Sequence, residues 1–166
     1  LENMLQALKH RGPDSTGFAL YGEGHDNDYI MRFKVGENVK EGSSAVNEDK
    51  SVYDARKKQV DAHLKELGAE VVKEEQITPY SFKYIMKYDG DLMEFSKTVE
   101  SVEMAEILSI GKHLELVKDI GDAGVVSKQY SLDKINGTHG IGHTRMATES
   151  GVDIRSAHPF WGYPFS

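Results

Sequence analysis

Apolar residues at helical spacing mark several segments of the chain. Side chains three or four positions apart share one face of a helix, so a repeat at that spacing predicts an amphipathic helix. Residues 51–67 place Val60, Leu64 and Leu67 on one such face. Gly68 follows as a helix stop. The other predicted helices are the end of one within residues 1–10, one that begins after Asp91 as its cap, and a short one over 123–130.

Most of the remaining segments have strand patterns. Residues 29–35 alternate apolar and polar side chains, which is typical of a strand. Residues 81–88 are rich in aromatic and β-branched side chains, which strands favour. The other predicted strands are 18–21, 69–77, 106–110, 113–117 (joined to the preceding one by a hairpin turn at Gly111 and Lys112) and, with turns, 137–148.

The predicted elements between residues 29 and 110 follow the order β-α-β-β-α-β. This order is typical of a ferredoxin-like sandwich. Since the region has its own amphipathic helices, we expect it to form a unit distinct from the segments that flank it. The sequence therefore predicts an α+β fold with an inserted β-α-β-β-α-β subdomain.

The composition is that of an ordinary globular protein. The chain has 166 residues, of which 39% are hydrophobic and 28% charged. Its formal net charge of −7 argues against nucleic acid as a partner, because phosphate binding needs a clustered basic surface. The apolar runs are too short to span a bilayer, so we expect no membrane association and a cytoplasmic location. The absence of cysteine excludes disulfides, thiolate metal ligands and a cysteine nucleophile within these residues.

Two stretches at opposite ends of the chain carry the candidate chemistry. The first is His-Arg-Gly-Pro-Asp-Ser-Thr-Gly at 10–17. The second is Gly-Ile-Gly-His-Thr-Arg-Met-Ala-Thr at 140–148, followed by Ala-His-Pro-Phe at 157–160. Taken singly, each is explained by ordinary turn or strand structure, since proline presets φ and aspartate bonds back to the chain. Their joint presence in this order is more specific.

With this pair of motifs the chain resembles class II glutamine amidotransferases, which are N-terminal nucleophile hydrolases. That family has an Arg-Gly-x-Asp-Ser/Ala-x-Gly turn and, later, a Gly-His-Thr-Arg-x-Ala-Thr strand followed by His-Pro. The run at 142–150 and the long insert are most similar to amidotransferases related to glutamate synthase and N-methylglutamate synthase. The resemblance implies a partial αββα sandwich, with amidotransferase core segments at 1–28 and 111–166 and an inserted α/β subdomain at 29–110.

The resemblance also implies a glutaminase activity, the hydrolysis of glutamine to glutamate and ammonia. In the family, an N-terminal cysteine attacks the side-chain amide, its own α-amine acts as the base, and water hydrolyses the thioester. The family pattern assigns Arg145 to the substrate α-carboxylate, which a planar guanidinium binds bidentately. It places Thr148 and Met146 in the same substrate wall, and Arg11 near the nucleophile as a supporting residue.

Parts of that machinery are expected outside these residues. The chain starts at Leu1 without a methionine and stops at Ser166 after an apolar, aromatic run, so we expect both ends to be internal to a longer protein. The resemblance places the nucleophilic cysteine before Leu1, and the Asn-Gly oxyanion hole and an amine-binding aspartate after Ser166. These residues alone are therefore expected to be inactive.

The resemblance implies glutamine as ligand and an ammonia-accepting synthase subunit or domain as partner. The expected acceptor is of the flavin-dependent glutamate synthase type. Met146 stands where the aminosugar-synthesising relatives have tryptophan, and Glu149 where they have histidine, so the acceptor reaction is the less defined step. No cofactor is expected, since the paired glycines at 22–24 and 140–142 lack the rest of a dinucleotide fingerprint.

A metal site is a competing hypothesis for the histidines of the second stretch. His139 and His143 lie four positions apart, and His158 is a candidate third ligand. A metal needs three or four convergent ligands, and the chain has no His-Glu-x-x-His arrangement. Packing or hydrogen bonding is the simpler role for these histidines.

The parent protein and Arg145 each allow a second interpretation. The parent is either an active enzyme or a catalytically inactive amidotransferase-like module for binding or regulation. Within the enzymes, asparagine synthetase also has an Arg-Gly-Pro-Asp turn. Arg145 either binds the substrate or forms only a structural salt bridge, with Glu149 or Asp153 as partner.

Overall fold

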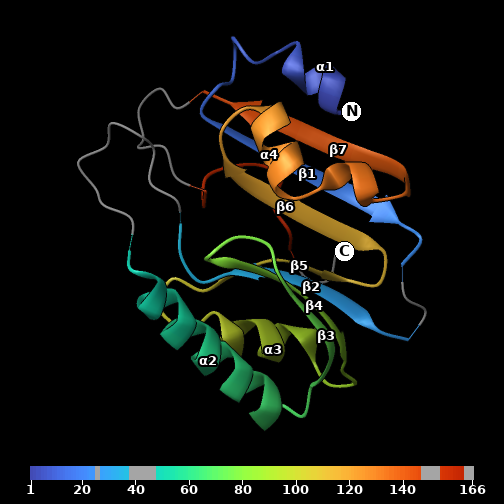
Figure 1. Cartoon of the computed structure of the whole chain (residues 1–166). Coiled ribbons are helices and arrows are strands. Elements are labelled where there is room, and N and C mark those ends of the chain that lie inside the picture. Colours follow the sequence, from blue (N-terminus) through green and yellow to red (C-terminus); the bar gives the residue numbers. More distant parts are fainter. Residues whose placement is uncertain (25–26, 38–47, 147–153, 163–166) are drawn as a thin grey trace. The chain divides into compact units, whose positions relative to one another are not determined.

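The chain folds into two compact units of the α+β class. The computed structural model describes residues 1–24, 27–37, 48–146 and 154–162. The described residues of Leu1–Glu23, Glu37–Asn47 and Leu116–Phe160 form the first unit, and those of Gly24–Gly36, Glu48–Glu115 and Trp161–Ser166 the second. Each unit contains helices and the strands of one antiparallel sheet, as the α+β prediction requires (Figure 1).

A three-stranded sheet is the basis of the first unit. Its elements are α1 (Glu2–Gln6), β1 (Ser15–Gly22), β6 (Leu114–Ile120), α4 (Ala123–Gln129), the 3₁₀ helix η1 (Leu132–Lys134) and β7 (Gly137–Arg145). The first two residues of β6, Leu114 and Glu115, are counted with the second unit. The strand order is β6-β1-β7, with β1 and β7 antiparallel. Helix α1 contacts β7 and α4, and α4 contacts β1 (Figure 1). Asp122 caps α4, because its carboxylate accepts hydrogen bonds from the backbone of Gly124 and Val125.

Helix α1 is shorter than the amphipathic pattern predicts. It has five residues, and Leu5 is the one buried among them. Leu5 packs against Gly142 of β7, where an added Cβ would lie 2.5 Å from the Leu5 Cδ1 atom. A helix of this length makes little more than one turn, so the rest of the apolar stripe is not brought onto the sheet. Met4 is accordingly 72% exposed.

The second unit has the predicted β-α-β-β-α-β order. Its elements are β2 (Tyr29–Lys34), α2 (Lys50–Glu66), β3 (Glu70–Gln76), β4 (Ser81–Lys87), α3 (Leu92–Val99) and β5 (Glu106–Gly111). The sheet order β3-β4-β2-β5 places β4 between the strands joined by α2, and β2 between those joined by α3. Both helices lie on the same side of this sheet (Figure 1). Asp91 caps α3 as predicted, by accepting a 2.7 Å hydrogen bond from Met93 N.

The face of the second sheet that the helices cover is apolar. The Phe33 ring packs against Phe82 and Tyr84, with centroids 5.3 and 5.0 Å away. All three side chains are at most 2% exposed, and each contributes about 1.5–3 kcal/mol to stability through burial. Tyr84 also donates a 2.7 Å hydrogen bond to Asp61, which ties α2 to the sheet.

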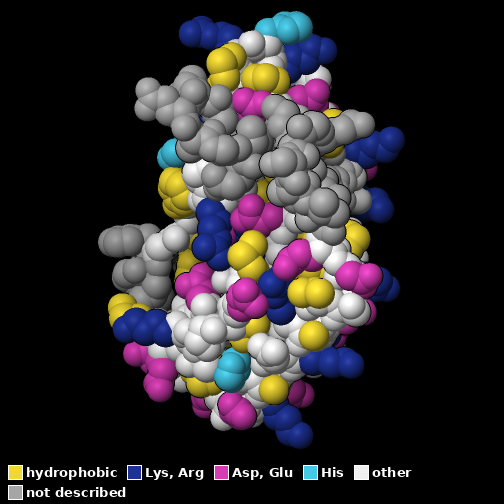
Figure 2. Space-filling model, turned by 90° about the vertical axis from the view of Figure 1, so that its left-hand side faces the viewer, with side chains coloured by type: hydrophobic (Ala, Val, Ile, Leu, Met, Phe, Trp, Pro, Cys, Tyr) yellow, Lys and Arg dark blue, Asp and Glu magenta, His cyan; other side chains and the backbone are white. Residues whose placement is uncertain are grey.

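The surface of the described residues carries charges of both signs. Figure 2 shows Lys and Arg side chains interspersed with Asp and Glu on one face of the molecule. Among the helices of the described ranges, none has both the length and the apolar character needed to cross a bilayer.

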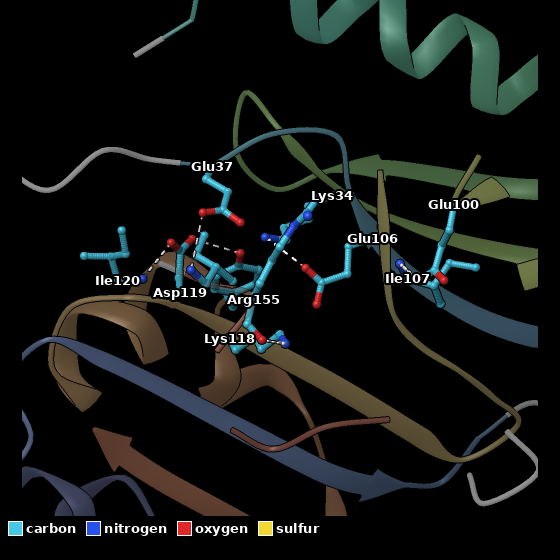
Figure 3. A network of polar contacts seen from close by, with 11 residues as sticks. Lys34, Glu37, Glu100, Glu106, Ile107, Lys118, Asp119, Ile120 and Arg155 are labelled. Atoms are coloured by element: carbon cyan, nitrogen blue, oxygen red, sulfur yellow. Dashed lines mark hydrogen bonds and ion pairs between the residues drawn. The ribbon is translucent and has the colours of Figure 1, made fainter. Parts of the chain in front are cut away.

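The polar side chains at two positions of β2 are buried. Arg32 and Lys34 are 3% and 1% exposed. The Arg32 Nη2 atom lies 2.7 Å from Glu115 Oε2. The Lys34 Nζ atom lies 3.0 Å from Glu106 Oε2 (Figure 3). Buried charges are tolerated when they are paired. One face of β2 is therefore apolar, and the other carries charged side chains that form ion pairs.

One further expectation differs from the structure. The predicted hairpin at Gly111 and Lys112 is wrong, because β5 belongs to the four-stranded sheet and β6 to the three-stranded one. A short turn between two apolar runs can join strands of two different sheets as well as two strands of one hairpin. Strand β3 forms as predicted, but it lies at the edge of its sheet and all seven of its residues are exposed.

Glu115 is the centre of the buried charge cluster in the second unit. Its carboxylate accepts a 2.8 Å hydrogen bond from Arg32 Nε and a 3.0 Å hydrogen bond from Lys83 Nζ. Burial by itself would raise the pKa of Glu115, but the two positive charges and their hydrogen bonds lower this pKa below its ordinary value of 4.5. The ionised form therefore stabilises the fold above that pH, and the contribution is lost as the pH falls below it.

Replacement of Glu115 tests this cluster. We expect Glu115→Gln to lower the free energy of unfolding at pH 7 by roughly 2–4 kcal/mol, because it leaves buried positive charges without their counter-ion. The difference from the unsubstituted chain should shrink as the pH falls below about 4.5. Urea unfolding between pH 7 and pH 3 measures both effects. Glu75→Gln, on exposed β3, is the control, and an equal pH dependence in both variants would contradict the assignment.

Candidate functional site

The pairing of β1 with β7 brings the two sequence motifs together. Ser15 lies opposite Arg145, Gly17 opposite His143 and Ala19 opposite Ile141. The prediction that the two motif strands belong to one structure is therefore confirmed. The register aligns the end of the Arg-Gly-Pro-Asp turn with the arginine that the resemblance assigns to the substrate.

The turn that precedes β1 is held by backbone contacts on two sides. Asp14 N donates a 3.1 Å hydrogen bond to the carbonyl of Arg145, and Gly121 N donates a 3.0 Å hydrogen bond to the carbonyl of Asp14. The hydroxyl of Thr16 donates a further 2.8 Å hydrogen bond to the carbonyl of Gly121. Gly12 lies so close to β7 that an added Cβ would be 2.7 Å from Thr144. The turn is thus fixed between β7 and the residue that follows β6.

A short segment after β7, residues 154–160, packs onto the same strands. An added Cβ at Gly17 would overlap the backbone carbonyl of His158, so β1 and this segment are in direct backbone contact. The His158 ring also lies 4.9 Å from the His143 ring. Ile154 and Ala157 anchor the segment, with 0% and 1% exposure.

Arg145 is partly buried, and its guanidinium points to the 154–160 segment. Its Nη1 group donates a hydrogen bond to the hydroxyl of Ser156. Arg11 contributes to the turn through its backbone, with a 2.8 Å hydrogen bond from Arg11 N to the Leu8 carbonyl, while its side chain is exposed. Met146 is 47% exposed beside Arg145. Thr148, Glu149 and Asp153 lie outside the described residues, so the predictions that involve them stay predictions.

The three histidines considered as metal ligands have different neighbours. His139 stacks on Tyr21 with ring centroids 4.5 Å apart, whereas His143 contacts His158. Among the described residues, no three His, Cys, Asp or Glu side chains gather in a way that could hold a metal ion. Partial burial, the nearby His158 and the charge of Arg145 lower the pKa of His143 below its ordinary value of 6.5. The neutral imidazole is therefore the favoured form of His143 at neutral pH.

The structure adds Ser156 and the role of Gly17 to the residues that the sequence singles out. Ser156 directly precedes the Ala-His-Pro-Phe motif, so its position was visible, but a serine has too many ordinary roles to be selected by type. Gly17 is the last residue of the first motif, and the reason for a glycine there is a contact with residues 154–160, which are far away in sequence. Both become informative only when β7 and residues 154–160 are placed on β1.

The fold and the site together define a class of protein. It is an α+β protein in which an Arg-Gly-Pro-Asp turn and an arginine-bearing strand meet in one antiparallel sheet, with a His-Pro segment packed onto both. Comparison of the sequence with those of known proteins shows which proteins this chain is similar to.

Two relatives match nearly the whole chain. A protein of Methanothermobacter thermautotrophicus named "Putative glutamine amidotransferase" is 31% identical over 167 residues, which is 98% of this chain and 51% of the relative. The "Glutamine amidotransferase-like protein GlxB" of Rhizobium meliloti is 28% identical over 163 residues, which is 96% of this chain and 48% of the relative. No protein-family model matches the chain. The names of these relatives support an amidotransferase family, and the chain spans about half the length of each.

A substitution at Gly17 tests the packing of the 154–160 segment. Gly17→Ala should lower the free energy of unfolding by roughly 1–3 kcal/mol, because the new methyl group must displace the backbone at His158. Gly162→Ala is the matched control, since no atom of the described residues lies within 4 Å of the Cβ it would add. We expect that control to stay within about 0.5 kcal/mol of the unsubstituted chain in urea unfolding. Equal stabilities for the two variants would contradict the close approach.

Proposed function

We propose that this chain is part of a class II glutamine amidotransferase domain, with a glutaminase reaction that starts at an N-terminal cysteine. The chain has no cysteine, so the proposed nucleophile belongs to a part of the protein outside these 166 residues. The relatives, which are about twice as long, leave room for it. In this proposal, residues 1–28 and 111–166 belong to the amidotransferase core, and 29–110 is the inserted α/β subdomain.

The observation that carries the proposal is the register of β1 with β7. It places Arg145 opposite Ser15, directly after the turn of the first motif. A free amino acid carries an α-carboxylate, and a guanidinium binds a carboxylate through two parallel hydrogen bonds. An arginine held on a strand supplies that fork at a fixed position. In this proposal Arg145 binds the glutamine α-carboxylate. The roles of Met146 and Thr148 beside the substrate, and of Arg11 in support of the nucleophile, are those that the family resemblance implies.

The chemistry follows from an activated thiol. The cysteine α-amine takes the thiol proton, and the thiolate attacks the carboxamide carbon of glutamine. The carbon–nitrogen bond breaks, ammonia leaves with a proton returned by the amine, and a thioester remains. Water then hydrolyses the thioester to glutamate and restores the thiol. The ammonia is passed on to an acceptor, for which we propose a synthase subunit or domain.

An inactive amidotransferase-like module is the second candidate. One of the two relatives is named only as amidotransferase-like, which keeps this candidate open. Such a module would still bind a ligand through Arg145, but it would lack the nucleophile needed for catalysis. The identity of the first residue of the mature full-length protein separates the two candidates.

The first test of the proposal uses the full-length protein that contains this chain. We expect its mature N-terminal residue to be cysteine, and we expect release of ammonia from glutamine in the presence of a chelator. Replacement of that cysteine by alanine should abolish the release, whereas binding of glutamine should persist. N-terminal sequencing and an ammonia assay measure these outcomes. Serine or alanine at the first position, together with no glutaminase activity, would favour the inactive module.

The second test concerns Arg145. In the full-length protein, Arg145→Lys should weaken glutamine binding by about 1.5–3 kcal/mol, because lysine cannot form the second charge-assisted hydrogen bond to the carboxylate. The loss should appear in KM for glutamine. Arg155→Lys, an exposed position in the adjoining segment, is the control. An unchanged KM and rate in Arg145→Lys would remove Arg145 from the substrate site.

A further inference from the structure

The segment 154–160 is anchored on both sides of Ser156. The Ala157 N–H donates a 3.0 Å hydrogen bond to the carbonyl of Ile154, which closes a turn around the serine. Both of these anchors are buried. Ile154 N also donates a 3.4 Å hydrogen bond to the carboxylate of Glu37. Ser156 therefore sits in a turn whose two ends are fixed.

Lys118 of β6 adds a second attachment for this segment. Its Nζ atom donates a 3.5 Å hydrogen bond to the carbonyl of Arg155, directly before Ser156 (Figure 3). The same atom lies 4.9 Å from the centroid of the Phe160 ring, a cation–π distance. Lys118 is 3% exposed, so its position is well defined by its surroundings. One lysine thus contacts the segment at both ends.

The distance of this segment from the sheet is set by Gly17. Because Gly17 has no side chain, the His158 backbone lies directly on β1. The turn that contains Ser156 is thereby close enough to β7 for a contact with Arg145. There the Ser156 hydroxyl accepts a hydrogen bond from Arg145 Nη1. Two independent features, the Gly17 contact and the His143–His158 ring contact, therefore fix the segment that carries the acceptor.

We propose that Ser156 is a positioning residue, which orients the Arg145 guanidinium for the α-carboxylate of the substrate. The inference rests on the function proposed above, and it extends that function to a residue outside the turn and strand motifs. A hydroxyl is a neutral acceptor, so this hydrogen bond restricts the guanidinium without adding a negative charge beside it. A carboxylate in the same place would orient Arg145 as well, but would also compete with the substrate for its charge.

Three variants of the full-length protein test the role of Ser156 in steady-state glutaminase assays. Ser156→Ala should raise KM for glutamine about 3- to 10-fold and change kcat less than about 2-fold, because the lost interaction orients a binding group. Ser156→Thr keeps the hydroxyl and should stay within about 2-fold of the parent KM. Ser101→Ala, which removes a serine hydroxyl bonded to a backbone carbonyl elsewhere, should leave KM unchanged. A loss of kcat alone, or the same KM for Ser156→Ala and the parent, would overturn the inference.

A double-mutant cycle separates this inference from the proposed function. In the Arg145→Lys background, Ser156→Ala should change KM by less than about 2-fold, since the group it orients is already gone. If Arg145→Lys alone leaves KM unchanged, the substrate role of Arg145 and the role of Ser156 both fail. If Arg145→Lys raises KM while Ser156→Ala does not, Arg145 keeps its role and the Ser156 inference alone is overturned. Full additivity of the two substitutions would also overturn it, and circular dichroism at the assay temperature confirms that each variant is folded.

Discussion

The antiparallel register between β1 and β7 is the constraint on which the candidate site depends. Side chains alternate between the two faces of a strand, so a slip of one residue would move Arg145 to the opposite face. The register is supported on both faces. On one face, Leu5 packs against Gly142, and on the other, the His143 ring contacts His158. The hydrogen bond from Asp14 N to the Arg145 carbonyl then fixes the strand end at which the turn and the arginine meet.

The two units hold their arginines in different ways. In the second unit, Arg32 is buried against the carboxylate of Glu115, which both orients and neutralises the guanidinium. In the first unit, the Arg145 guanidinium donates a hydrogen bond to the hydroxyl of Ser156, which is a neutral acceptor. The first arrangement is suited to a structural cluster. The second fits the role proposed for Arg145, in which the guanidinium binds the carboxylate of a substrate.

The sequence predicted most helices and strands, but it did not predict which of their polar side chains are buried or which residues they contact. Helix α2 and the Asp91 cap follow from apolar spacing and local capping chemistry, which are properties of neighbouring residues. The motif pair likewise predicted that β1 and β7 share a structure. The burial of Lys34 was not predictable, because alternation shows that two faces differ but not what covers each of them. The contact of Ser156 with Arg145 was not predictable either, since it requires the backbone approach at Gly17.

The pairing of positions 15 and 145 also has a consequence for the order of folding. Closing a loop loses more chain entropy as the loop grows, and contacts between distant residues form late for that reason. Most strand pairs of the second unit join residues that are much closer in sequence, such as Glu70 with Lys87. We therefore expect the second unit to condense first and to shorten the effective loop between β1 and β7. On a ribosome, the segment that carries Arg145 would find its partner strand only after the intervening stretch of chain had already folded.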